Sequence, residues 1–494
     1  MTTQVTHPRY PFIDGHFDTS RSSITFETIN PADESLLAEV VQCEPGHVAD
    51  AVESASRAQT AWWALSPSAR GDALWNWGRL IEQNGDELAL LDTQNNGQPL
   101  DVAREHVVGA TRNAKYWGGM ADKISGQQLP LTPGHLTYTR REPFGVVGVI
   151  VPWNAPMAGF TGRVSAAIAC GNGVVMKPSE LSPASALRLA ELAVEAGIPA
   201  GLVNVVTGDG RVGQAITTHP DIHCITFTGS PSTGRLINAT AAEAFKKVTL
   251  ELGGKSPNII FDDADLDAAV PGAAWSVFRN AGQMCCGGTR VLVQRSIVED
   301  VSRRLAEVAG RIRVGDPTDP RSHVGPVVSK AQFERVVGYL ELGLSEGANI
   351  LIGGRRPASI PGDKGFYLSP TIFTDVTSNM RIAQEEIFGP AVVVIPFDDE
   401  EDAIRIAGDV EYGLAAMVWT RDVARMHRVA NALDVGVVWG NTTIINHPGL
   451  PFGGFRNSGL GNAFGDQAIE GMTKVKRVTI RHDSSPVYPH WVDL

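Results

Sequence analysis

"GVVGVIVPW" (Gly145–Trp153) is an unbroken apolar run that ends at a proline and a tryptophan. Four further runs of the same kind follow it, "GVVMKPS", "GLVNVVTG", "CITFTGS" and "KVTLELGG", at 173–179, 201–208, 224–230 and 247–254. Runs this short and this apolar are typical of strands that are buried on both faces. We therefore expect these five segments to form one parallel sheet.

The segments between these runs are expected to be helices. The clearest is 182–197, in which Ser182 suits the N-cap, Pro183 the first helical position and Gly197 the stop. Strands that alternate with helices predict an α/β fold, and ligands of such folds bind at the carboxyl ends of the strands.

The remaining parts of the chain differ in pattern. The first ~120 residues are expected to be helical, because residues 48–91 carry apolar side chains at helical spacing. Residues 255–450 form a second α/β region. "HLTYTRREP" (135–143) and "TKVKRVTIRH" (473–482) alternate as strands do and lie outside both regions. Such arms could pair with each other and with another subunit.

The length and composition of the chain limit the classes of protein to which it can belong. The 494 residues exceed a single core, which stops growing at roughly 250–300 residues, so two or three domains are expected. The net charge of -12 argues against nucleic acid and against an anionic membrane surface. Five cysteines without a C-x-x-C pair imply neither zinc nor disulfides. No signal-peptide core is present near the first residue, so a reducing, cytoplasmic location and no membrane or metal partner are expected.

Two glycine-rich turns are candidates for binding a phosphate. "GDGRVG" (208–213) spells G-x-G-x-x-G, but position 228 is threonine where the dinucleotide fingerprint places an acid. A tight turn beside a cofactor and a true fingerprint both remain open. "FTGSPSTGR" (227–235) is the better candidate, since Gly229 and Ser230 open a helix whose dipole favours an anion. A bare strand-to-helix turn is the alternative.

"NAGQMCCGGTR" (280–290) places two thiols, Cys285 and Cys286, among small residues. A thiolate is a strong nucleophile that can also leave, so one of the two could carry covalent chemistry. Two buried, unreactive cysteines are the alternative from the local sequence alone.

Seven motifs, in order, resemble the NAD(P)-dependent, hydrolytic aldehyde dehydrogenases. They are "PWN" (152–154), "KPSE" (177–180), "FTGS" (227–230), "ELGGKSP" (251–257), "GQMC" (282–285), "EEIFGP" (385–390) and "PFGGFRNSG" (451–459). The resemblance implies a Rossmann-like parallel-sheet nucleotide-binding domain, an α/β catalytic domain and a small β bridging element for oligomerisation. It places the NAD-binding domain at 1–122 and 144–252, the catalytic domain at 253–450 and the bridging element at 123–143 and 471–494.

The resemblance also implies the catalytic roles. Cys285 matches the nucleophile of G-Q-x-C, Asn154 the donor that stabilises the oxyanion, and Glu251 the general base that activates water for thioester hydrolysis. The expected reaction converts an aldehyde, NAD and water into a carboxylate and NADH. Because Glu180 resembles a carboxylate that bonds both adenosine ribose hydroxyls and repels a 2′-phosphate, NAD is expected over NADP. The remaining residues expected to bind the cofactor are Trp153, Lys177, Ser179, Gly208, Gly229, Ser230, Gly253, Glu386 and Phe388.

The chain departs from the family around the substrate. Small residues stand where relatives often carry bulky ones, which predicts a wide pocket and a bulky, apolar or aromatic aldehyde. The expected pocket residues are Ala155, Gly159, Gly162, Met284, Cys286, Asn446 and Phe452. The usual G-R-E triplet is absent from the loop that follows "PFGGFRNSG", where "GLGNAFG" (459–465) stands instead.

Two other interpretations remain open. A relative that transfers the acyl group to coenzyme A would lack the general base, so Glu251 argues against it. A non-catalytic relative would tend to lose the nucleophile or the base, and this chain keeps both. The expected assembly is a homodimer or homotetramer, and the sequence does not distinguish the two.

Overall fold

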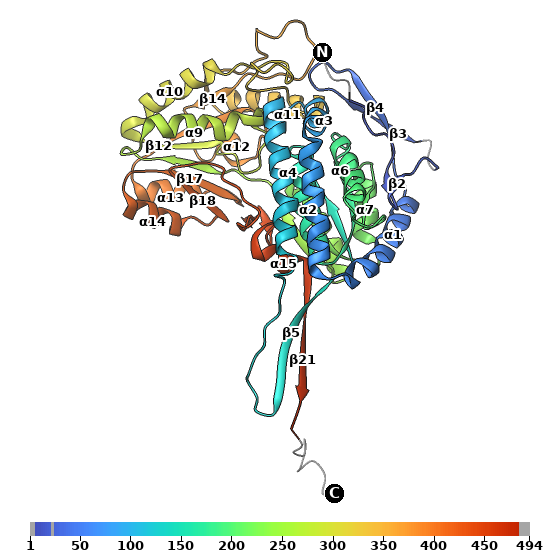
Figure 1. Cartoon of the computed structure of the whole chain (residues 1–494). Helices are drawn as coiled ribbons and strands as arrows, with labels where there is room; N and C mark the ends of the chain where they lie inside the picture. Colours follow the sequence, from blue (N-terminus) through green and yellow to red (C-terminus); the bar gives the residue numbers. More distant parts are fainter. Residues whose placement is uncertain (1–4, 21–23, 484–494) are drawn as a thin grey trace.

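The computed structural model describes residues 5–20 and 24–483 of the chain. Two large sheets, each wrapped by helices, form the body of the molecule, and a narrow two-stranded arm projects from it (Figure 1). The predicted fold class, α/β with parallel sheets, is confirmed. All five cysteines are free thiols.

The first sheet contains the five strands predicted from the apolar runs. They are parallel in the order β8-β7-β6-β9-β10, and shorter antiparallel strands close both edges. The strands are β2 (His16–Phe17), β1 (Phe12–Ile13), β8 (Val203–Val205), β7 (Gly173–Lys177), β6 (Val146–Ile150), β9 (Ile222–Thr228), β10 (Lys247–Glu251) and β20 (Gly459–Leu460).

Helices bury both faces of this sheet, as its continuous apolar strands require. One face packs against α1 (Pro45–Ala64), α7 (Gly210–Thr218) and α8 (Pro231–Glu243). The other packs against α2 (Pro67–Gln83), α3 (Gly85–Asn96), α4 (Leu100–Met120), α5 (Pro156–Ala169), α6 (Ala184–Glu195) and α15 (Gly465–Met472).

The second sheet has seven strands in the order β13-β14-β15-β12-β11-β17-β18. They are β13 (Asn349–Ile352), β14 (Thr371–Thr374), β15 (Ala391–Phe397), β12 (Arg290–Gln294), β11 (Pro257–Ile260), β17 (Ala415–Trp419) and β18 (Val437–Gly440). Its helices are α9 (Leu266–Phe278), α10 (Val298–Arg311), α11 (Lys330–Ser345), α12 (Arg381–Gln384), α13 (Glu400–Gly408) and α14 (Val423–Ala432).

The arm consists of the two segments that alternate in the sequence. β5 (His135–Pro143) pairs with β21 (Thr473–Arg481) antiparallel and in register over nine residue pairs. The arm extends away from the body (Figure 1). The segments thus pair with each other within one chain. Residues 484–494, assigned to the bridging element from the sequence, lie outside the described residues.

Two sequence-based predictions need correction. The first part of the chain is not all helix, because strands β1 to β4 precede Pro45, with β3 (Thr25–Ile29) paired to β4 (Leu36–Val41). The helix expected at 182–197 begins later, at Ala184. Ser182 does not cap it, since its hydroxyl donates to the carbonyl of Trp153 at 3.4 Å. Gly197 lies just beyond the end with φ +90°, as its stop role requires.

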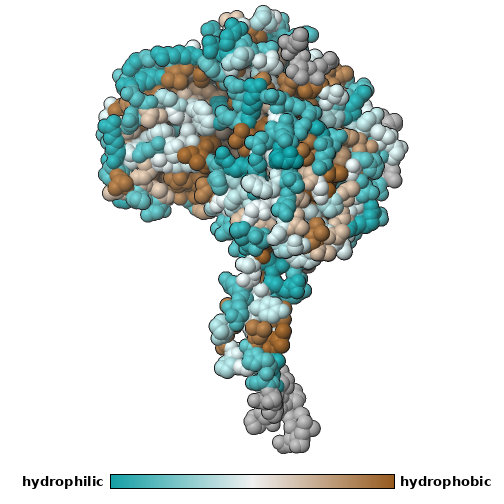
Figure 2. All heavy atoms as spheres, in the orientation of Figure 1, coloured by the Kyte–Doolittle hydropathy of each residue, from teal (hydrophilic) through white to brown (hydrophobic). Residues whose placement is uncertain are grey.

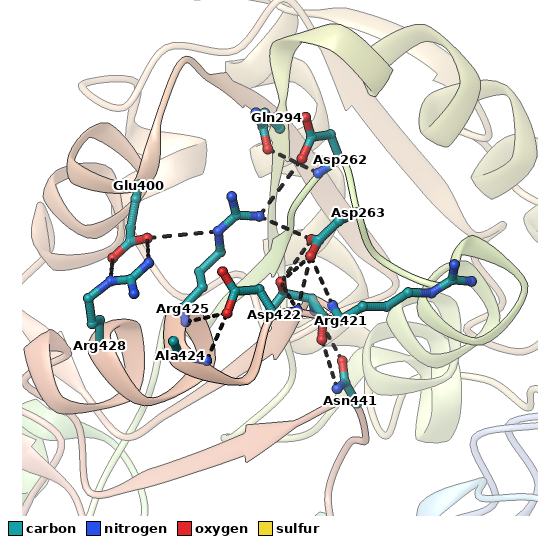
Figure 3. Close-up of polar contacts among 11 residues, drawn as sticks. Asp262, Asp263, Gln294, Glu400, Arg421, Asp422, Ala424, Arg425, Arg428 and Asn441 are labelled. Atoms are coloured by element: carbon teal, nitrogen blue, oxygen red, sulfur yellow. Dashed lines mark hydrogen bonds and ion pairs between the residues drawn. The ribbon is translucent and has the colours of Figure 1, made fainter.

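Charged side chains fasten the carboxyl ends of β11 and β17 to α14 (Figure 3). Asp263 accepts from the backbone N–H groups of Arg421 and Asp422, at 3.1 and 3.0 Å. Arg425 reaches both Asp263 and Glu400, at 3.1 and 3.8 Å. This cluster lies at the end of the sheet opposite to Cys285, which precedes β12, so its role is to hold the second sheet together.

Within residues 5–20 and 24–483, no helix is both long and apolar enough to cross a bilayer.

Candidate functional site

The two sheets meet end to end at the predicted catalytic residues. Asn154 follows β6 and Glu251 ends β10, so both stand at carboxyl ends of the first sheet. Cys285 precedes β12 of the second sheet, within residues 279–289, which we call the catalytic loop. The side-chain amide of Asn154 donates to the carbonyl of Gln283 at 2.9 Å, which joins the sheets directly. A Cβ at Gly254 would meet the carbonyl oxygen of Cys285 at 2.5 Å, so only glycine permits this approach.

The catalytic loop begins with a strained turn. Asn280 and Ala281 have φ of 52° and 54°, in the left-handed region that non-glycine residues seldom adopt. Gly282 follows at φ 74°, and a Cβ there would collide with the carbonyl oxygen of Gly389. Strain of this kind costs about 1–3 kcal/mol per residue and is retained where the surrounding structure fixes the chain.

Gln283 provides much of this fixation, and the G-Q-x-C spacing did not reveal it. Its side-chain oxygen accepts from the Val328 N–H at 2.9 Å, and its amide nitrogen donates to the Asn280 carbonyl at 3.0 Å. Asn280 in turn donates to the carbonyl of Asn154 at 3.0 Å. The loop therefore reaches Cys285 with its backbone held from both sheets.

The two adjacent thiols lie in different environments. Cys285 is half-buried, whereas Cys286 is 4% exposed and packs in an apolar cluster with Leu414, Met417 and Trp439. Only the first thiol is accessible from the site. A hydrogen bond with the Cys286 thiol, followed by burial, raises the pKa of Cys285 well above its ordinary value.

Glu251 has the environment of a proton acceptor. It is 3% exposed, and neither carboxylate oxygen forms a hydrogen bond with a side chain of the described residues. Burial raises the pKa of Glu251 to about 8, against the opposing charge of Arg163. A carboxylate that titrates near neutrality and is not committed to a donor can accept a proton from water.

The turn that carries Asn154 is held from behind by residues that the motifs did not indicate. The side-chain amide of Asn96, at the end of α3, donates to the Trp153 carbonyl at 2.9 Å. Ser182 donates to the same carbonyl. Asn96 of α3 and Ser182, just before α6, thus fix the exit of β6.

The residues predicted to bind the cofactor divide into two groups. The first group lies at the ends of β7, β8 and β9. The Lys177 ammonium is 3.5 Å from the Glu180 carboxylate, and Glu180 is partly exposed while Lys177 and Ser179 are buried. Ser230 is the N-cap of α8 and accepts from the Thr233 N–H at 3.3 Å, with Gly229 just before it. Gly208 has φ +141° and a Cβ there would collide with Gln42, so this turn also requires glycine.

The second group surrounds the catalytic loop. Glu386 accepts from the Gly254 N–H at 3.0 Å, and a Cβ at Gly253 would collide with its carboxylate. Burial raises the pKa of Glu386 to about 7. The Trp153 and Phe388 rings meet edge to face with centroids 5.3 Å apart.

Helix α11 supports this second group, which the sequence alone did not indicate. Gln332 donates to the Phe388 carbonyl at 2.8 Å, and Arg335 donates to the Glu386 carbonyl at 2.6 Å. Both donors bind backbone carbonyls. Helix α11 therefore fixes the backbone at Glu386 and Phe388, and this backbone sets where their side chains lie.

The residues expected to line the substrate pocket differ in the free space around them and in their exposure. At Gly162 a Cβ would meet the Phe464 ring at 2.8 Å, so that ring fills the space that a larger side chain would occupy. At Gly159 a Cβ would meet only Val151, at 3.5 Å or more. Ala155, Met284 and Phe452 are half-buried, and Asn446 is exposed.

Sequence and structure comparisons agree on one family. The aldehyde dehydrogenase family model matches residues 17–478. The chain belongs to the aldehyde dehydrogenase family. An aldehyde dehydrogenase of Aspergillus niger is 45% identical over 473 residues, which cover 95% of this chain and 94% of the relative.

Solved structures match the fold over nearly the whole chain. The NAD+ complex of the Bacillus cereus enzyme gives a TM-score of 0.95 at 42% identity, covering 97% of this chain and 98% of that one. PnpE from Pseudomonas sp. WBC-3 gives 0.96 at 40% identity, covering 98% and 99%. The expected family and fold are confirmed, and the chain is an oxidoreductase that acts on aldehydes.

Proposed function

We propose that this aldehyde dehydrogenase oxidises its substrate to a carboxylic acid with NAD, through a thioester on Cys285 that water cleaves with Glu251 as base. One observation carries the proposal. Glu251 is a buried carboxyl group whose oxygens form no hydrogen bond with a side chain of the described residues, and it stands at the end of β10 beside the catalytic loop.

Formation of the covalent adduct uses Cys285 and Asn154. The Cys285 thiol, whose pKa is raised in the free protein, first releases its proton to solvent. The thiolate then attacks the aldehyde carbon, and the carbonyl oxygen becomes an oxyanion. The Asn154 amide carries two N–H donors, of which one is bound to the Gln283 carbonyl, so the other can serve the oxyanion together with the Cys285 backbone N–H. Preorganised donors of this kind are worth about 3–4 kcal/mol each.

Loss of hydride and hydrolysis complete the reaction. The bound dinucleotide supplies the hydride acceptor, and the adduct on Cys285 becomes a thioester. Glu251 then takes a proton from water as the water attacks the thioester carbonyl, and the Cys285 thiolate departs. Because Glu251 is an effective base only when ionised, this step should accelerate as the pH rises toward about 8.

The residues at the strand ends fit a dinucleotide. The N-terminus of α8, capped by Ser230, suits a phosphate group, while Lys177 and Glu180 suit the hydroxyls of a ribose. The partly exposed Glu180 carboxylate would repel a 2′-phosphate, which favours NAD over NADP. A comparison of kcat/KM for the two cofactors tests this preference, and Glu180→Gln should narrow the ratio between them.

Transfer of the acyl group to coenzyme A is the second candidate reaction. It needs no water-activating base, so the buried Glu251 favours hydrolysis over it. The deciding experiment follows NADH formation from a panel of aliphatic, aromatic and terpenoid aldehydes, with and without coenzyme A. Equal rates and a free acid product support hydrolysis, whereas a strict requirement for coenzyme A, or no NADH with any aldehyde, contradicts the proposal.

We further propose that the substrate is bulky, apolar or aromatic. Ala155 and Gly159 support this, because they present little side-chain volume beside Asn154. Gly162 no longer supports it, since Phe464 fills the space beside it. The candidate pocket without Gly162 consists of residues near the start of α5 together with Met284, Cys286, Asn446 and Phe452.

The arm supports a homo-oligomer. Leu136, Val475 and Ile480 are 40%, 62% and 48% exposed on it, and apolar side chains are visible along the arm in Figure 2. An isolated two-stranded ribbon is marginally stable in water. We propose that the arm packs against another subunit.

A further inference from the structure

Arg163 is a buried cation that none of the sequence motifs indicated. It lies on α5 and is 6% exposed. Its guanidinium donates to the Thr228 hydroxyl at 2.9 Å and lies over the Phe464 ring, 5.4 Å from the centroid. A guanidinium keeps its charge at every pH at which proteins are active, so this is a fixed positive charge.

Sheet register places this charge beside Glu251. Thr228 and Glu251 are direct partners in the parallel pair β9–β10. Neighbouring strands lie about 4.8 Å apart, and register partners project on the same face of the sheet. A group bonded to the Thr228 side chain is therefore next to the Glu251 carboxylate, whose oxygens form no hydrogen bond with a side chain of the described residues.

We propose that Arg163 is a positioning residue that keeps Glu251 in the ionised form needed to activate water. This rests on the proposed role of Glu251 as the base. The alternative is that Arg163 only fills space between α5 and the first sheet.

The charges around Glu251 are few. Burial raises the pKa of Glu251, the charge of Arg163 opposes this rise, Cys285 adds to it, and the backbone N–H of Ala463 also lowers it. Cys285 itself responds to Cys286 and Glu386. The other elements packed against Glu251 contribute no titratable group here, since β9 supplies Thr228, β20 supplies Gly459, and residues 462–464 are Asn, Ala and Phe. The first acid of α15, Asp466, is exposed. Arg163 is thus the one cation that acts on Glu251 in the described part of the chain.

The surroundings of Arg163 explain two departures from the family pattern. Gly162 leaves room for the Phe464 ring, which lies against the guanidinium. Ala463, just before that ring, stands in "GLGNAFG" (459–465), where the usual G-R-E triplet is absent. Because this segment contains no acidic side chain, none in it competes with Glu251 for the charge of Arg163.

The test compares Arg163→Met, Arg163→Lys and wild type across pH 6–10. The steady-state rate and the first-turnover release of NADH are both measured with one good aldehyde. Without the cation, the pH midpoint of the steady-state rate should rise by about one unit, a loss of about tenfold at pH 7 that disappears by pH 10. The first turnover should change little, and lysine should restore most of the midpoint.

The controls separate charge from structure. Arg70→Met is matched, because Arg70 is also buried, lies 4.9 Å from the Trp63 ring and donates to a backbone carbonyl. It should leave the midpoint unchanged. If Arg163→Met does not fold, Thr228→Val removes the anchor and keeps the charge, and it should give a smaller shift in the same direction.

The outcomes distinguish this proposal from the proposed function. An equal loss of rate at every pH, or a midpoint that does not move in any Arg163 or Thr228 variant, overturns the role of Arg163 while leaving the enzyme an aldehyde dehydrogenase. Failure of the wild-type protein to release NADH with any aldehyde overturns the proposed function instead.

Discussion

The side-chain amide of Asn154 is bound to the backbone carbonyl of Gln283, two residues before Cys285, at 2.9 Å. One side chain therefore ties the carboxyl end of β6 to the catalytic loop. In the proposed mechanism the same side chain also stabilises the oxyanion, and the two contributions can be separated by experiment.

Asn154→Ala should lower kcat by about 10²- to 10³-fold, because a preorganised oxyanion donor is lost. The first-turnover rate of NADH release measures this loss directly. Alkylation of Cys285 by iodoacetamide reports whether the loop keeps its position. An unchanged alkylation rate with slow first turnover assigns the loss to the oxyanion, whereas a first turnover as fast as wild type contradicts the role.

The two thiols should respond differently to substitution. Cys285→Ala should lower turnover by more than about 10⁴-fold, because the covalent step is lost. Cys286→Ala should keep most of the activity, since that thiol packs among Leu414, Met417 and Trp439 and only a small apolar group is removed. NADH release and thermal unfolding of both variants check this. Near-normal turnover of Cys285→Ala would reject the nucleophile.

Glu251→Gln should separate thioester formation from its hydrolysis. A stopped-flow trace should show at most one NADH per site, followed by very slow turnover. In the wild type the pKa of about 8 predicts the sign of the pH dependence: below it the base is protonated and the rate falls, and above it the rate reaches a plateau. Steady turnover of the glutamine variant at the wild-type rate would remove Glu251 from the mechanism.

Local sequence and long-range contacts explain which parts of the site could be foreseen. The strand ends that carry Asn154, Lys177 and Glu251 follow from apolar runs, because a buried parallel strand requires them. Arg163 could not be inferred in this way, since its neighbours Thr228 and Phe464 are distant in sequence and meet it only in the folded chain.

The substrate pocket, too, could not be predicted fully from the local sequence. A count of small residues on α5 predicted free space at Gly162, but a ring from a loop 302 positions later occupies it. Likewise, Ser182 has the composition of an N-cap, yet its hydroxyl binds the carbonyl of Trp153. In both cases the local sequence favours one arrangement, and a contact with a distant part of the chain imposes another.

Gly159 now provides the best test of substrate size. A Cβ there would make only ordinary contacts with Val151, at 3.5 Å or more, so the first atom of a side chain at position 159 requires no backbone movement. Replacing a glycine inside a helix also favours folding. In the wild type, kcat/KM should be higher for a ten-carbon or aromatic aldehyde than for acetaldehyde, because each buried CH₂ is worth about 0.8 kcal/mol, about fourfold in binding.

Gly159→Phe should lower this preference by filling the pocket near Asn154. The matched control is Gly338→Phe, at an exposed helical position of α11 where a Cβ would meet nothing within 4 Å. It should leave the ratio of the two kcat/KM values as in the wild type. The proposal fails if acetaldehyde is the better substrate of the wild type. It also fails if phenylalanine at position 159 lowers both values equally, because the residue would then affect catalysis without bounding the space that the substrate fills.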